Sequence, residues 1–209
     1  SVLRIDSSEA TSYRVHLPDS YAREPHRRYP VVYVLDGSSQ DVHTSASAEL
    51  MARLGAMPET VVIGIPNTGS EGRNRDYTPP GMRQDADDAH SPAGLADRFL
   101  DFLQHELIPQ VEREYRANGE RVLAGNSRGG LFVIHSFIAR PALFHAWIAN
   151  SPALWRDDAA MVRRLDAFLR DHRDLRTTLF LSLGGAENAK MAGAYRQAEH
   201  RLLQDGRAV

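Results

Sequence analysis

The chain has 209 residues and a mass of 23.3 kDa; 42% of its residues are hydrophobic and 25% are charged. Such a chain can bury roughly 70% of its unfolded surface, so it predicts one globular domain and excludes a disordered, collagen-like or coiled-coil protein. The net charge of −2 without a basic run argues against a nucleic-acid partner, the absence of cysteine excludes disulfides, and no apolar run approaches the ~20 residues of a membrane span.

The first half of the chain predicts three strands and a long connection. Residues 13–17 alternate in polarity and predict an edge strand, antiparallel to residues 2–5. Residues 31–35 and 61–65 are continuous β-branched runs that end at turn residues, which is typical of strands buried on both faces. The polar stretch 67–92 predicts one long connection, and loops of that length are usually functional or disordered.

The second half of the chain alternates between helical and strand patterns. The helix expected from Ala93 to Tyr115 contains Pro109, which predicts a kink, and Asn188 is a candidate N-cap for the last helix. Because strands alternate with helices, we expect an α/β fold with a mostly parallel sheet and helices on both faces. The remaining predicted strands are 121–124, 145–149 and 178–183, and the remaining predicted helices are 130–139, 158–171 and 189–204.

A G-x-S-x-G pattern at 125–129 lies between a predicted buried strand and a predicted helix. In this context the pattern predicts a nucleophile elbow, in which a sharp turn exposes the oxygen of Ser127 at the carboxyl end of the sheet. The following helix N-terminus favours negative charge. The alternative is a glycine-rich turn with an incidental serine.

An acyl-transfer site also needs donors for the oxyanion. The backbone N–H of Arg128, the residue after the serine, is one candidate. The second should follow an earlier central strand, where Asp36 and Gly37 precede Ser38, so the N–H of Ser38 is the expected donor. The alternative is that Asp36 and Gly37 form a plain turn that ends the strand.

These segments together resemble the bacterial "putative esterase" family of α/β-hydrolases, most closely its siderophore-esterase-like branch. Related members are S-formylglutathione hydrolases and mycolyltransferases. The resemblance implies a serine hydrolase that acts on carboxylic esters. The family usually has histidine where this chain has Asn126, which leaves the nucleophile unchanged. The matching segments are 16–21, 29–37 (YPVVYVLDG), 73–79 (RNRDYTP), 99–109, 123–131 (LAGNSRGGL) and 151–155.

The α/β-hydrolase order of nucleophile, acid and histidine makes Glu187 the candidate acid, because it follows the last predicted strand in a glycine turn. The alternative is a solvated loop carboxylate. Only His200 follows Glu187, and helical geometry turns it about 180° from the apolar face of the last helix. The resemblance implies a histidine in a loop beyond Val209. We therefore expect a single α/β-hydrolase domain over residues 1–209 that lacks its last strand and helix, or else a protein that has lost its base.

Candidate substrate contacts are Arg75, Tyr77 and Trp155. Arg75 and Tyr77 lie in the polar stretch 73–77, whose arginines would suit an anionic or catecholate substrate, and the alternative is an internal salt-bridge cluster. Trp155 could line the acyl pocket, or simply pack in the core. His135 is expected in the core and His43 in a structural role. We expect no metal and no cofactor, because no acid has metal-ligand spacing with His90 or His105.

The sequence therefore predicts an esterase that works through an acyl-enzyme on Ser127, acting on a siderophore-type or other small-molecule ester. Two alternatives stay open: an acyltransferase on the same fold, and a non-catalytic binding module. The expected partner is a small-molecule ester, with no nucleic acid and no membrane span. The oligomeric state and the compartment, cytoplasmic or periplasmic for a soluble protein, are undetermined.

Overall fold

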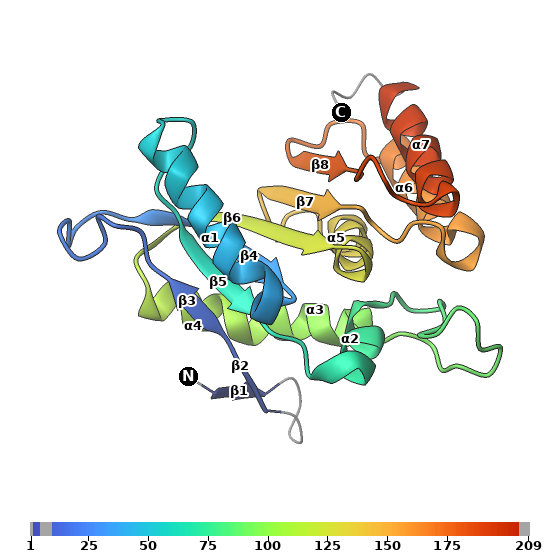
Figure 1. The fold of residues 1–209 in the computed structure, drawn as a ribbon, viewed down its shortest axis with the longest axis horizontal. Helices are drawn as coiled ribbons and strands as arrows, with labels where there is room; N and C mark the ends of the chain where they lie inside the picture. The colour runs from blue at the N-terminus through green and yellow to red at the C-terminus, as the bar shows by residue number, and fades with distance from the viewer. Residues whose placement is uncertain (1, 5–9, 205–209) are drawn as a thin grey trace.

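In the computed structural model, residues 2–4 and 10–204 are described, and a six-stranded sheet forms the centre of the molecule (Figure 1). The strand order is β3-β5-β4-β6-β7-β8, and all neighbours run parallel except β3 and β5. The predicted mostly parallel α/β sheet is confirmed. The strands are β3 (Arg14–His16), β4 (Tyr29–Leu35), β5 (Val61–Ile65), β6 (Ala117–Asn126), β7 (Ala146–Asn150) and β8 (Thr178–Ser182).

The predicted edge strand is present, but its predicted partner is wrong. β3 pairs antiparallel with β5, with Val15 opposite Ile63. β1 (Val2–Arg4) pairs instead with β2 (Ala10–Ser12) in a separate two-stranded sheet. The apolar run of β5 therefore has a strand on both sides, consistent with its complete burial.

Helices cover both faces of the sheet, as predicted. One face is covered over β4 and β5 by α1, whose Ala48 packs on a small cluster containing Val32, Val34 and Val62. The other face carries the main core, which includes side chains of α3, α4, α5, α6 and α7. The helices are α1 (Gly37–Arg53), α2 (Gly69–Tyr77), α3 (Ala96–Phe102), α4 (Ile108–Glu114), α5 (Arg128–Ala139), α6 (Arg156–Asp171) and α7 (Ala189–Gln204).

Two helices were not predicted. In α1 only Gly37 and Asp41 are buried, while Val42 and Leu50 are 62% and 58% exposed, so its sequence shows no apolar stripe of helical period. α2 lies within the stretch 67–92, which was predicted as a loop because its residues are polar. Both helices nevertheless follow carboxyl ends of strands, and both reach the site described below.

The long helix expected from Ala93 to Tyr115 is divided. α3 and α4 are joined by a π-helical turn, Leu103–Leu107, which ends just before Pro109. Proline lacks an N–H and its ring clashes with the carbonyl four residues earlier, so a wider turn before it accommodates the ring. The predicted irregularity is therefore confirmed, but it lies one turn earlier than the proline.

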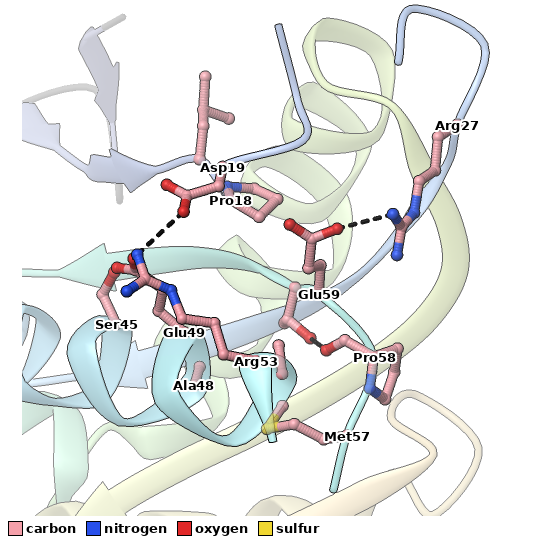
Figure 2. A pocket seen from close by; sticks show the side chains of 13 residues that line it. Pro18, Asp19, Arg27, Ser45, Ala48, Glu49, Arg53, Met57, Pro58 and Glu59 are labelled. Carbon is pink, nitrogen blue, oxygen red and sulfur yellow. Dashed lines mark hydrogen bonds and ion pairs between the residues drawn. The ribbon is translucent and has the colours of Figure 1, made fainter. Parts of the chain in front are cut away.

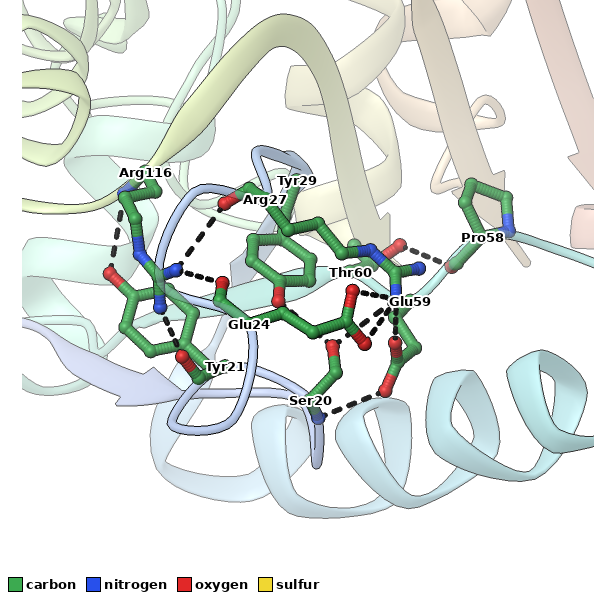
Figure 3. A network of polar contacts seen from close by, with 9 residues as sticks. All are labelled: Ser20, Tyr21, Glu24, Arg27, Tyr29, Pro58, Glu59, Thr60 and Arg116. Carbon is green, nitrogen blue, oxygen red and sulfur yellow. Dashed lines mark hydrogen bonds and ion pairs between the residues drawn. The ribbon is translucent and has the colours of Figure 1, made fainter.

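The segment that leads into β4 is held by a polar network at the amino end of the sheet (Figure 3). The Ser20 hydroxyl is 2.8 Å from the Tyr29 hydroxyl, and the Ser20 N–H donates to Glu59 Oε1 at 3.1 Å. The Arg116 guanidinium lies 3.8 Å from the centre of the Tyr21 ring and donates to the Tyr21 carbonyl. This network fixes the start of β4, and hence the register of the central strand.

Candidate functional site

Ser127 occupies a strained turn between β6 and α5. Its backbone angles are φ 57° and ψ −114°, a region that L-residues rarely adopt, at a cost of about 1–3 kcal/mol. The turn is tied to the end of β7, because the Ser127 N–H donates to the Asn150 carbonyl at 2.9 Å and the Ser127 carbonyl accepts from Ala153 at 3.0 Å. Strand, sharp turn and helix thus occur as the nucleophile-elbow pattern predicts.

Glycines allow the elbow to close. A Cβ placed on Gly125 would lie 2.6 Å from the Gly129 carbonyl carbon and oxygen, so β6 and α5 could not approach as they do. A Cβ on Gly130 would lie 3.0 Å from Pro152 Cα and 3.1 Å from the Asn150 carbonyl oxygen. Both positions therefore need glycine because a larger residue would collide with neighbouring backbone, and Ser127 lies between them in the chain.

The predicted second oxyanion donor lies at the N-terminus of α1. Asp36 adopts the left-handed conformation (φ 55°), and the amides of Ser39 and Gln40 donate to its carbonyl. Ser38 is the second residue of α1 and Arg128 the first of α5, so the amides of both are among those without an intrahelical acceptor. A Cβ on Gly129 would lie 3.5 Å from Asp36 Oδ2, so the two helix N-termini are neighbours. The assignment of Ser38 and Arg128 to an oxyanion hole remains a prediction.

A partly buried ion pair holds the Asp36 turn. Arg73 donates through Nε and Nη2 to the two Asp36 oxygens, at 2.7 and 2.8 Å, and Asn67 Nδ2 donates to Oδ1 at 2.8 Å. The hydrogen bonds to Asp36 raise the pKa of Arg73 above its ordinary value. The Asp36 N–H donates to the Tyr77 hydroxyl at 3.2 Å. Asp36 is therefore the centre of a hydrogen-bond network and does more than end the strand with a simple turn.

Sequence reasoning chose Arg75 and Tyr77 from this stretch and missed Arg73. Arg75 makes a bidentate ion pair with Asp76, which also accepts from Arg98 at 3.0 Å, so Arg75 belongs to an internal salt-bridge cluster, the alternative reading of the stretch. Tyr77 is 1% exposed, and burial raises the pKa of its hydroxyl. The Tyr77 hydroxyl accepts the Asp36 N–H and so supports the Asp36 turn, while its predicted contact with a substrate stays a prediction.

Glu187 lies where the order of the fold predicts the acid. It follows β8, two strands from β6 in the sheet, and its N–H closes a turn on the Gly184 carbonyl at 3.1 Å. The Gly184 N–H donates to Ser151 Oγ at 3.2 Å, which links this turn to the end of β7. Its side chain is half-buried. The carboxylate is thus at the same edge of the sheet as Ser127, and its catalytic role stays a prediction.

No described histidine is hydrogen bonded to Ser127 or Glu187. His200 is exposed, as predicted, and lies beside the α6 residues Val162 and Asp166. From the start of α7 to His200 the helix rises about 16 Å away from the carboxyl edge of the sheet. His135 is 8% exposed and bonds to Asp97 at 2.7 Å, which confirms its place in the core. His43 is exposed on α1.

Trp155 is half-buried at the start of α6 and lines a cavity of about 470 Å³. Lys190 Nζ lies 4.8 Å from its ring centre, and Arg83 and Asp157 also line the cavity. This cavity is at the carboxyl side, between the stretch after α2 and the start of α7. Trp155 is thus available to a ligand there, as an acyl-pocket residue would need to be.

A second cavity, of about 220 Å³, lies at the opposite, amino end of β5 (Figure 2). Its charged side chains are already paired: Arg53 with Asp19 at 3.0 Å, and Arg27 with Glu59 at 2.6 Å. Within residues 2–4 and 10–204 no group of three or more histidine, aspartate or glutamate side chains could hold a metal ion, and no helix has the length and apolarity to span a membrane.

Comparisons with known proteins agree with this geometry. Ferri-bacillibactin esterase BesA of Bacillus subtilis is 28% identical over 176 residues, which cover 78% of this chain and 61% of BesA. The BES protein of Bacillus cereus superposes with a TM-score of 0.83 at 22% identity, covering 98% of this chain and 80% of that chain. An IroE-like serine hydrolase of Shewanella oneidensis gives a TM-score of 0.72 at 26% identity, covering 96% and 79%.

The family match extends over all six strands of the central sheet. Residues 8–198 match the family described as "Putative esterase", from the segment before β2 to the third turn of α7. The strained serine turn, the paired helix N-termini and the carboxyl-edge glutamate all lie inside this match. The chain has the α/β-hydrolase fold and belongs to this esterase family.

Proposed function

We propose that the protein is a serine carboxylic-ester hydrolase that forms an acyl-enzyme on Ser127. The observation that carries the proposal is the strained Ser127 turn, set beside two helix N-termini at the carboxyl edge of the sheet. Backbone strain of this kind is retained where the surrounding structure needs it, and it clusters at active sites. The names of BesA, an esterase, and of the IroE-like serine hydrolase support the same reaction class.

In the proposed reaction Ser127 Oγ attacks the ester carbonyl and expels the alcohol, and water then releases the acid. The N–H groups of Ser38 and Arg128 stabilise the oxyanion, an interaction that is often the largest single contribution to such catalysis. Glu187 orients the histidine that takes the serine proton. None of the nine histidines, all of which lie among the described residues, bonds to Ser127 or Glu187, so we assign the base to none of them.

We further propose a siderophore-type ester as the substrate class, soluble and small enough to reach the carboxyl edge. The support is the relationship to BesA, whose name gives ferri-bacillibactin as its substrate, and to an Aspergillus fumigatus enzyme named siderophore triacetylfusarinine C esterase. The cavity beside Trp155 offers an aromatic wall to such a substrate. Its charged lining is mixed, with Arg83 and Lys190 beside Asp87, Asp157 and Asp158, so the cavity itself does not select an anionic group.

The test is covalent labelling. A fluorophosphonate probe should label Ser127, identified by mass spectrometry of the labelled peptide, and Ser127→Ala should abolish labelling and ester hydrolysis together. Ser182→Ala is a matched control at the end of another strand and should be labelled like the wild type. Persistent p-nitrophenyl ester turnover in Ser127→Ala would refute the proposal.

A further inference from the structure

The side chain of Arg128 is a guanidinium without a carboxylate, next to the nucleophile. Its Nη1 donates to Thr78 Oγ1 and to the Gln84 carbonyl, both at 2.7 Å. No aspartate or glutamate among the described residues is within ion-pair distance of it. Its Nε and Nη2 make no hydrogen bond to the protein and are not fully buried. Arg128 is half-buried, and the two N–H groups of its Nε–Nη2 edge are therefore not used by the protein.

A second guanidinium lies against the first. Arg156 Nη2 donates to the same Gln84 carbonyl at 3.1 Å and to the Arg83 carbonyl at 2.6 Å. Arg156 is 4% exposed, and its Nε is buried without a hydrogen-bond partner. Two cations thus share one neutral acceptor, an arrangement in which like charges destabilise each other.

Other arginines around the site differ in this respect. Arg73 is paired with Asp36 at 2.7 Å and Arg75 with Asp76 at 2.8 Å. Burial, followed by the charge of Arg156, lowers the pKa of Arg128 to about 10, so it is still a cation at neutral pH. Asp85 attracts Arg128, and Asp85, Asp87 and Asp157 attract Arg156. Among the described residues, however, no carboxylate is within ion-pair distance of either guanidinium, so the Arg128–Arg156 pair has negative charge nearby but no direct ion-pair partner.

We propose, on the basis of the esterase function above, that the Arg128 side chain binds a carboxylate of the substrate and selects esters that carry such a group near the scissile bond. The planar fork of arginine matches a carboxylate in a bidentate geometry, and the Nε–Nη2 edge of Arg128 is free to provide it. Arg128 follows Ser127 in the chain, and its guanidinium is held by Thr78 at the end of α2, a helix that packs against α5. We therefore place the bound carboxylate on the side of the serine turn that faces the end of α2. The adjacent charge of Arg156 strengthens the attraction.

The test compares two esters of similar length, p-nitrophenyl hemisuccinate and p-nitrophenyl valerate, through the ratio of their kcat/KM values. Arg128→Gln should lower the hemisuccinate-to-valerate ratio by about tenfold, because a hydrogen-bonded charge pair is lost. Arg128→Lys, which keeps the charge but not the fork, should give an intermediate ratio. Arg163→Gln, at an exposed arginine of α6, is the matched control and should leave the ratio unchanged.

A binding measurement separates this proposal from the esterase proposal. N-(4-nitrophenyl)succinamate, an amide analogue of the hemisuccinate, is measured by equilibrium dialysis against wild type and Arg128→Gln. Weaker binding to the variant supports the carboxylate site even if neither ester is hydrolysed, a result that would refute only the esterase proposal. Equal binding together with an unchanged ester ratio overturns the carboxylate site and leaves esterase activity untouched.

Discussion

Replacing Arg73 by methionine tests whether the Asp36 network supports the site. The substitution keeps the length and apolar bulk of the side chain but removes both bonds to a carboxylate whose side chain is 9% exposed. Among the described side chains, Asn67 alone would then donate to that carboxylate. Breaking a buried pair by removing one partner costs about 3–5 kcal/mol, and the partial exposure of Arg73 reduces this to about 2–4 kcal/mol.

The expected consequence is measurable in two assays. For a domain of this size 1 kcal/mol corresponds to roughly 2–4 °C, so the Tm of Arg73→Met should fall by about 6–12 °C for a loss near 3 kcal/mol. The Ser38 amide should lose its fixed position as the Asp36 turn relaxes, and kcat/KM on an activated ester should fall by about 10–100-fold, less than the loss of a whole oxyanion donor.

The matched control is Arg163→Met, which breaks an ion pair with an Asp158 that is fully exposed. Exposed pairs contribute about 0–1 kcal/mol, so its Tm should be nearly unchanged. If Arg73→Met melts within a degree or two of the wild type, the network does not hold the turn, and the reasoning about the second oxyanion donor fails with it.

Two further predictions concern Glu187 and His135. Glu187→Gln should lower kcat by about 10²–10⁴ with an unchanged Tm, because the base loses its orienting partner; wild-type kcat would show that the acid lies elsewhere. Burial lowers the pKa of His135 despite its bond to Asp97, so the unfolded chain binds more protons than the folded one just below pH 6.5, and the free energy of unfolding falls as the pH drops through that window. Urea unfolding at pH 7 and pH 5 should show a smaller fall for His135→Asn than for the wild type, and equal falls would contradict this.

The elements with strong apolar patterns could be predicted from sequence. β5 begins and ends at the predicted residues, and α7 has its predicted range, with Asn188 Oδ1 accepting the Met191 N–H at 3.0 Å as an N-cap does. The apolar face of α7 predicted that His200 points to solvent, which is confirmed. These predictions succeeded because burial and helical period were both visible in the residues.

The polar network that holds the Asp36 turn could not be predicted from the sequence, because it depends on which polar side chains face each other in the fold. Once α2 is known to be a helix, Arg73 and Tyr77 lie one turn apart on the face toward Asp36, and Arg75 lies off that face. A loop has no helical period, so a sequence read as a loop does not show which side chains share a face. The choice between Arg73 and Arg75 could therefore not be made from the sequence. The serine turn could be predicted because close backbone contacts require glycine on both sides of Ser127, and those glycines are visible in the sequence as the G-x-S-x-G pattern and the Gly130 that follows it.

The pairing of β4 with β6 has a consequence for how the protein folds. Val31 pairs with Arg121, about ninety residues later, so the centre of the sheet closes a long chain loop before these contacts stabilise it. The Asp36 turn and the Ser127 turn follow the ends of these two strands, and neither strained conformation is stabilised by its local sequence alone. Catalytic competence should therefore arise late in folding, together with the most distant pairing in the sheet, and recovery of activity after refolding would report on that step.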